Sequence, residues 1–156
     1  MNNIRHKRNK ILSKTFWITL LLKQNKYHRY GVLLHTLKVT YGAIKNKDYK
    51  FIAAGLFHDV GKPFVAYQKP EDIEVGEYSF TNHEEISYQI IKNWFFLSDY
   101  TKHITRYHYI LRDIKKCKKK NNYKRLSRLQ RAFDKLDSTF IKDLEQFLIY
   151  DDYGKE

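Results

Sequence analysis

The sequence is short of turn-forming residues and of cysteine. Among its 156 residues there are 6 glycines, 2 prolines and a single cysteine, Cys117. Few turn formers together with long periodic segments indicate an all-helical protein. One cysteine cannot form an intramolecular disulfide, so nothing in the sequence points to an oxidising compartment.

A membrane-spanning run is also missing. The longest early apolar run, residues 16–22, is far shorter than the roughly 20 residues that a membrane helix needs. Basic residues precede this run, as in a signal peptide, but polar residues 23–26 follow it where a small-residue cleavage site would stand. We therefore expect an intracellular protein located in the cytoplasm.

Positive charge, by contrast, is abundant. Lys and Arg number 30 against 17 Asp and Glu, which gives a formal net charge of +13. Such a charge makes a polyanion the first candidate partner: RNA, DNA, nucleotides or an anionic membrane surface. The alternative is a basic protein that is merely soluble. Hydrophobic residues make up 42% of the chain, so we expect one core and a single domain over residues 1–156, with a flexible basic N-terminus over residues 1–12.

Hydrophobic periodicity predicts a bundle of about six to seven helices. The predicted helices cover residues 13–23, 29–46, 48–58, 99–115 and 123–136, with another that begins in a capping box at Thr81 or Asn82 and a last one after Ser138. Residues 59–80 are predicted to form a long connection, which can serve as one wall of a site or as a lid. Residues 115–125 are predicted to form a basic connection that can bind nucleic acid.

A motif at the end of the third predicted helix carries candidate chemistry. His58 is directly followed by Asp59, and Gly61 and Pro63 supply a turn around Lys62. An imidazole and a carboxylate side by side can both ligate a metal. Lys62 then offers a fixed positive charge to a bound anion. A His-Asp pair at a helix end is often only a capping arrangement, so this interpretation depends on further ligands.

Further candidate ligands lie on other predicted helices. His35 follows Val32 at i, i+3, and His108 follows Ile104 at i, i+4, so both imidazoles lie on apolar stripes. A lone histidine on such a stripe is more often a satisfied core residue. His83 lies in the first turn of its helix, where the dipole disfavours a charged imidazole. A neutral ligand or a donor to a phosphate is the better role there.

Asp151 continues the apolar stripe of the last helix. An unpaired buried charge is costly, so this carboxylate must be paired or bound to a cation. The candidate ligands from five predicted helices exceed what core histidines supply by chance: His35, His58, Asp59, His83, His108 and Asp151. Imidazoles and carboxylates suit Mn, Fe, Co, Ni or Zn. His6 and His103 stay outside the set.

The order His35, His58-Asp59 and Asp151 resembles the signature of the HD-domain metal-dependent phosphohydrolases. Residues 54–63, 80–84 and 151–155 are similar to the HD domains attached to bacterial tRNA nucleotidyltransferases, and the resemblance runs from about residue 27 to residue 155. The pattern Asp-x-x-Gly followed by a basic residue selects Asp151 over Asp152, as helical phase does. No acidic palm motif precedes the helical part, so tRNA-end polymerisation is not implied.

The resemblance implies an all-α hydrolase that acts on a nucleotide or RNA-end phosphoester, including a 2′,3′-cyclic phosphate, by metal-activated water. A divalent transition metal, or Mg, would be held by His35, His58, Asp59 and Asp151. His83 and His108 would either complete a second metal site, or hold phosphate or donate a proton. Lys62 would contact the substrate phosphate, so the implied catalytic residues are Asp59, Lys62, His83 and His108.

Two other functions stay open. A minority branch of HD proteins comprises mixed-valent di-iron oxygenases, which use the same His, His-Asp, His, His, Asp order, although Lys62-Pro63 is closer to the hydrolase pattern. A non-catalytic nucleic-acid-binding module would use residues 116–124 and the basic sixth helix, and its RNA binding would survive Asp59→Ala. Such a module has no need of six aligned ligand-type side chains, which favours the hydrolase. The oligomeric state stays open.

Overall fold

The computed structural model describes residues 20–21, 24, 26 and 28–156, and this part of the chain is all-α as predicted. Apart from helices it contains only an isolated antiparallel bridge between Tyr67 and Ser79. His6 and most of the predicted helix over residues 13–23 lie outside the described residues. No helix in the described ranges is long and apolar enough to cross a membrane.

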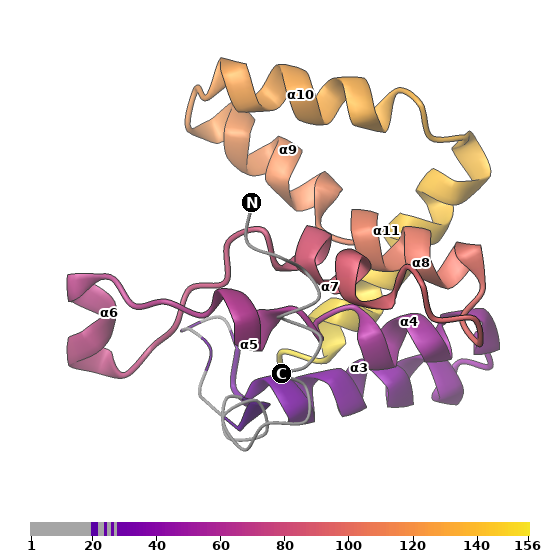
Figure 1. Ribbon diagram of the computed structural model, residues 1–156, viewed down its shortest axis with the longest axis horizontal. Helices are drawn as coiled ribbons and strands as arrows, with labels where there is room; N and C mark the ends of the chain where they lie inside the picture. The colour runs from indigo at the N-terminus through magenta and orange to yellow at the C-terminus, as the bar shows by residue number, and fades with distance from the viewer. Residues whose placement is uncertain (1–19, 22–23, 25, 27) are drawn as a thin grey trace.

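Helices far apart in sequence form the centre of the fold (Figure 1). Helix α3 (Val32–Lys45) packs against α4 (Ile52–Phe57), which follows the 3-10 helix η2 (Tyr49–Phe51), and against the C-terminal α11 (Ser138–Tyr153). The rings of Phe51 and Phe147 are fully buried and their centroids lie 5.7 Å apart. Burial of these aromatic side chains anchors α11 on the N-terminal half of the fold.

The predicted connection over residues 59–80 contains two short helices, α5 (Lys62–Val65) and α6 (Pro70–Val75). Helix α6 lies on an arm that projects from the rest of the molecule (Figure 1), and it ends at Gly76, whose φ of 64° is left-handed. A residue with left-handed backbone conformation commonly terminates a helix, and glycine adopts this conformation without a steric penalty.

Helix α7 (His83–Ile91) begins where expected, but the predicted capping box is wrong. Asn82 has a left-handed backbone with φ of 66°, and its side chain accepts no capping hydrogen bond. A side-chain cap requires an extended residue at this position. The left-handed turn instead sets the direction in which α7 leaves the connection, with His83 as its first residue.

Two predictions for residues 99–125 are wrong: the single helix over residues 99–115 and the basic connection that follows it. The predicted helix is broken at His108 and Tyr109 into α8 (Asp99–Tyr107) and α9 (Ile110–Lys119). The basic residues up to Lys119 are helical rather than part of a connection, because Ile114 and Cys117 give α9 an inward face. Helix α10 (Tyr123–Phe133) packs back against α9, and this pair lies on the side of the molecule opposite α3 and α4 (Figure 1).

Candidate metal centre

The His58-Asp59 pair lies where α4 ends. His58 is the residue after the helix, and its Nδ1 lies 2.9 Å from the carbonyl oxygen of Gly55. The following turn packs tightly against the start of α7: a Cβ on Gly61 would lie 2.6 Å from the His83 carbonyl oxygen and from the Ser87 nitrogen. Only glycine therefore fits at this position, and the close packing brings His83 toward Asp59.

A first cluster joins three helices at the end of α4. The Nε2 atom of His35 lies 3.3 Å from Nε2 of His58 and 3.1 Å from Oδ1 of Asp151. Oδ2 of Asp59 lies 3.3 Å from each of these imidazole nitrogens. All four side chains are buried; His35, His58 and Asp59 form one metal-competent group, and Asp151 adjoins it through the two histidines.

A second cluster lies on the other side of Asp59. Oδ1 of Asp59 is 3.2 Å from Nε2 of His83 and 3.9 Å from Nε2 of His108. The break between α8 and α9 leaves His108 facing the centre, with its Nδ1 2.7 Å from the carbonyl oxygen of Thr105. Asp59 is thus shared by two groups of metal-competent side chains, one for each of its carboxylate oxygens.

The hydrogen bonds of the histidines favour metal binding over mutual pairing. In His58, His83 and His108 the Nδ1 atom lies 2.7–2.9 Å from the carbonyl oxygen three residues earlier, so it carries the donated proton. A neutral imidazole then has only a lone pair at Nε2. The Nε2 atoms of His83 and His108 nevertheless face each other at 3.3 Å. A cation between these nitrogens relieves the repulsion, and backbone-held imidazoles are typical of metal ligands.

Asp59 also lacks the partners that a buried carboxylate needs. Neither of its oxygens accepts a hydrogen bond of normal geometry. The Lys62 ammonium approaches Oδ2 to 2.6 Å, but without the alignment of a hydrogen bond. Buried carboxylate oxygens without hydrogen-bond donors are costly, so these two oxygens, one of them held only by an ion pair, fit a cation-binding role at the centre of an imidazole cluster.

Protonation of the centre follows from its charges. Burial disfavours the imidazolium form of His58, but the carboxylates of Asp59 and Asp151 outweigh burial and raise its pKa to about 9. Burial favours neutral Asp59, yet His58 and Lys62 outweigh burial and hold the pKa of that carboxyl well below its usual range. Burial lowers the pKa of His108 well below its ordinary value. Asp59 is thus anionic and His108 neutral, as metal ligation requires, whereas His58 would have to release its proton when a metal binds.

The end of α11 supplies the candidate ligand Asp151 and also Gly154, whose missing side chain leaves room for His35. Asp151 is buried, whereas Asp152 is exposed. A Cβ on Gly154 would lie 2.5 Å from Val39 Cγ2 and 2.8 Å from Nδ1 of His35. The Asp-x-x-Gly spacing thus places a carboxylate on the cluster and leaves room for the His35 ring one turn later.

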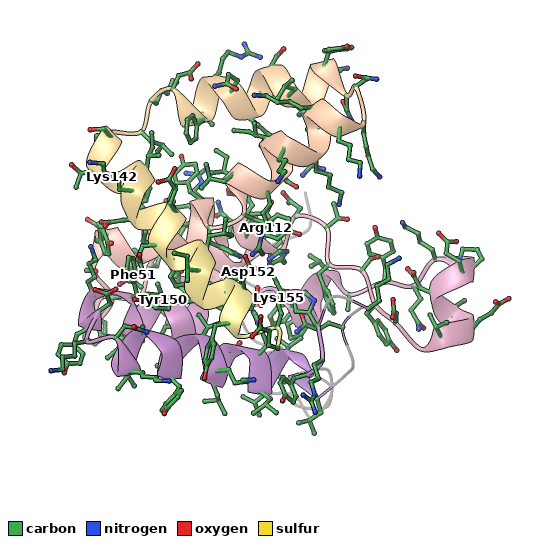
Figure 2. All side chains as sticks on the ribbon, turned by 180° about the vertical axis from the view of Figure 1, so that it is seen from behind. Phe51, Arg112, Lys142, Tyr150, Asp152 and Lys155 are labelled. Carbon is green, nitrogen blue, oxygen red and sulfur yellow. The ribbon has the colours of Figure 1, made fainter. Side chains whose placement is uncertain are left out.

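Arg112 belongs to the site but was not predicted from the sequence. It comes from α9 and hydrogen-bonds to both Asp151 and Asp152, while Lys155 lies 3.0 Å from Asp151 and 2.8 Å from Asp152. Figure 2 shows Arg112, Asp152 and Lys155 close together near the end of α11. Because Asp151 directs Oδ1 to the histidines and Oδ2 to Arg112, the arginine orients this candidate ligand. No local pattern distinguishes Arg112 from the other cations of this basic stretch, because its role depends on the packing of α9 beside the end of α11.

A cavity of about 150 Å³ opens beside both clusters. Asp59, His83, His108 and Asp151 contribute to its wall, as do the cationic side chains Lys62, Arg112, Lys116, Arg125 and Lys155. Lys62 is nearly buried, and its Nζ also donates to Oε1 of Gln24 at 2.5 Å. Cationic donors next to a metal-competent cluster make the cavity suited to a phosphate or another compact oxyanion.

Two further residues of the cavity were not predicted. His28 lines it with its ring 5.2 Å from that of His35, and burial, aided by the charge of Lys62, lowers the pKa of His28 to about 3. Tyr109 lines it from the break between α8 and α9. His103, by contrast, is exposed on α8 as predicted and stacks on Tyr107 outside the cavity.

Comparison with known proteins gives one family match. The model of the HD domain matches residues 28–139, which include five of the six candidate ligands and end before Asp151. No curated protein and no solved structure gave a significant match. The family match does not single out the HD domains of tRNA nucleotidyltransferases. Since it covers more than half of the sequence, the chain belongs to the HD-domain family, a family of metal-dependent phosphohydrolases.

Proposed function

We propose that this protein is a metal-dependent phosphohydrolase or phosphodiesterase that cleaves the phosphoester of a nucleotide or of an RNA end, including a 2′,3′-cyclic phosphate. One observation carries the proposal: Asp59 is shared by two buried ligand clusters beside a cavity lined by five Lys and Arg side chains. A cofactor-binding cluster and an oxyanion-binding wall in one cavity are the two requirements of metal-assisted phosphoester hydrolysis.

The residues present fit one or two divalent ions. His35, His58, Asp59 and Asp151 would hold the first, and Asp59 with His83 and His108 would hold the second. The shared carboxylate and the facing lone pairs of His83 and His108 favour two ions. Mn, Fe, Co, Ni or Zn suits this donor set, and Mg is the alternative among hard cations. When bound, the metal supplies Lewis acidity toward a phosphoryl oxygen and lowers the pKa of water.

The cationic side chains of the chain bind and orient the phosphoester. Lys62, Arg112 and Lys155 line the cavity within reach of the same carboxylates that would hold the metal. Lys62 has three donor protons, so it can keep its bond to Gln24 and still contact a phosphoryl oxygen. These fixed charges stabilise negative charge that develops on the phosphoryl oxygens as the ester is cleaved.

His83 and His108 have two roles that depend on the number of ions. With two ions they are ligands. With one ion, His83 at the cavity wall would act as an imidazolium, whose Nε2 proton could be donated to a phosphate oxygen or to the leaving oxygen, whereas the lowered pKa of His108 keeps that imidazole neutral. Metal content therefore decides between these roles.

The size of the cavity favours recognition of a substrate end. A volume of about 150 Å³ is smaller than the roughly 300–1,000 Å³ of pockets that enclose a drug-sized ligand. A phosphoester group can enter such a cavity while the remainder of a nucleotide or RNA stays outside. The di-iron oxygenase alternative has no comparable need for five cationic side chains around the centre.

A product assay tests the proposal directly. The purified protein is incubated with Mn, Ni, Co or Mg and with RNA that ends in a 2′,3′-cyclic phosphate, cyclic nucleotides and bis(p-nitrophenyl) phosphate. We expect metal-dependent release of product, its loss in Asp59→Ala, and normal activity in Glu145→Ala, a matched exposed carboxylate on α11. A folded, metal-loaded protein that cleaves none of these substrates refutes the proposal. Two irons per chain with oxygen consumption would establish the oxygenase instead.

A further inference from the structure

The positive charge of the chain is concentrated on one supersecondary unit. We call α9, α10 and the residues that flank them up to Lys135 the basic hairpin. Residues 112–135 contain eleven Lys and Arg and two Asp, a net charge of +9 out of the total of +13. The basic hairpin lies on one side of the molecule (Figure 1), so the charge forms a localised surface rather than an even coat.

The cations on α10 form an exposed stripe. Lys124, Arg128 and Arg131 stand at i, i+4 and i+7, which places them on one helix face, and all three are exposed. On α9, the spacing of Arg112, Lys116 and Lys119 gives a second stripe. This arrangement holds like charges next to one another, which destabilises a free helix and favours a polyanion as partner.

The acidic residues of the basic hairpin leave these stripes unneutralised. Asp113 is buried and forms an ion pair with Arg125. Asp134 accepts a hydrogen bond from Gln130. Within the described ranges, no carboxylate forms an ion pair with the following exposed cations of the basic hairpin: Lys115, Lys116, Lys118, Lys119, Lys120, Lys124, Arg128 and Arg131. Their charge is available to a ligand.

The α9 stripe reaches the cavity. Arg112 and Lys116 of α9 and Arg125 of α10 all line the cavity beside the metal centre. The α9 stripe therefore begins at the cavity wall and leads outward to Lys119 near the tip of the basic hairpin. A polyanion bound along the α9 stripe would therefore have one end beside the metal centre.

Aromatic side chains stand at both ends of this path. Tyr109 lines the cavity with the Arg112 guanidinium 5.6 Å from its ring centroid, and Tyr123 at the tip of the basic hairpin is 70% exposed. Cationic side chains interleaved with accessible rings are the usual surface for single strands, whose unpaired bases can stack. A duplex offers no free base faces, so these rings favour a single strand.

We propose that the basic hairpin binds the phosphodiester backbone of a single-stranded nucleic acid and directs its end into the cavity. The substrate is then an oligonucleotide end rather than a free mononucleotide. Delivery of the strand end into the cavity rests on the proposed hydrolase function, whereas binding of the strand to the basic hairpin does not.

Fluorescence anisotropy with a labelled single-stranded RNA of about 12 nucleotides tests the interface. The variant Lys124→Gln/Arg128→Gln/Arg131→Gln is compared with Lys45→Gln/Lys47→Gln/Lys142→Gln, which removes the same charge from exposed positions on α3, its C-terminal flank and α11. Three lost phosphate contacts should weaken binding on the order of 100-fold at about 50 mM salt and lower the salt slope by about 2. The control variant should bind like the unmodified protein.

Three results would overturn the interface: unchanged binding in the hairpin variant, equal loss in both variants, or hairpin-dependent binding to phosphatidylserine vesicles without RNA binding. Hydrolysis of bis(p-nitrophenyl) phosphate by the unmodified protein is measured on the same preparation. Hairpin-dependent RNA binding by a metal-loaded protein that cleaves neither this ester, cyclic nucleotides nor RNA with a 2′,3′-cyclic phosphate supports the interface and refutes the hydrolase. If the RNA end enters the cavity, RNA with a terminal phosphate binds more tightly than RNA with a terminal hydroxyl; equal affinity overturns delivery of the end.

Discussion

The Nε2 atoms of His83 and His108 face each other at 3.3 Å while both Nδ1 atoms point to backbone carbonyl oxygens. Neither nitrogen of the facing pair has a proton to donate when the imidazoles are neutral. Oδ1 of Asp59 completes this group, and its other oxygen belongs to the His35 and His58 cluster. The chain thus holds donor atoms in a geometry that a cation stabilises.

Divalent metal should stabilise the fold, because only the folded chain assembles the ligands. At a metal concentration about 100 times Kd, stabilisation is about 2.7 kcal/mol, which raises Tm by roughly 5–10 °C for a domain of this size. We expect this rise in differential scanning fluorimetry after metal is added to stripped protein. His108→Ala should reduce the rise, whereas His103→Ala, an exposed histidine on α8, should keep it. Equal rises in both variants would contradict the assignment of His108.

Arg112 should control metal affinity through Asp151 rather than by contact with the ion. Arg112→Ala removes the partner that orients Asp151, and loss of such an orienting partner costs about 10–100-fold in metal affinity. Arg112→Lys should restore only part of it, because the shorter lysine carries a point charge and lacks the planar guanidinium that directs one N–H to each carboxylate.

The matched control for Arg112 is Arg106→Ala on α8, which loses an ion pair with Glu85 but lies outside the cavity. Its metal affinity, measured by isothermal titration calorimetry, should equal that of the unmodified protein. If Arg112→Ala also leaves metal affinity unchanged, Arg112 has no positioning role.

Gly154→Ala should loosen the first cluster. The added Cβ would lie 2.8 Å from Nδ1 of His35, so the ring or the end of α11 must move. Overpacking of this kind costs about 1–3 kcal/mol, and displacement of His35 should also weaken metal binding. Gly76→Ala is the control, because its left-handed φ imposes strain in open space far from the ligands. It should lower Tm without changing metal affinity; a similar affinity in both variants would refute the steric account.

Helical periodicity was sufficient to predict most of the fold and to select inward-facing ligand candidates. His35, His108 and Asp151 lie on apolar stripes, and the structure turns those stripes toward the centre. The helix predicted over residues 29–46 is observed as Val32–Lys45, because its apolar spacing is regular throughout. Local pattern alone therefore distinguished Asp151 from the exposed Asp152.

Features that depend on tertiary contact could not be predicted in this way. The break at His108 and Tyr109 has no glycine or proline to mark it. Arg112 resembles any other cation of a basic helix until α9 packs beside the end of α11. The helical state of the Lys-rich stretch up to Lys119 depends on burial of Cys117, which outweighs the repulsion of neighbouring lysines.

The most direct measurement is a titration of metal-stripped protein with Mn²⁺, in which hydrolysis of bis(p-nitrophenyl) phosphate is followed at each addition. With Asp59 shared by two ions, activity should rise until about two equivalents are bound and should fall by at least about 1,000-fold in Asp59→Ala, since the common ligand of both ions is lost. No hydrolysis at any metal concentration, or undiminished hydrolysis in Asp59→Ala, would contradict a metal-dependent phosphohydrolase centred on Asp59.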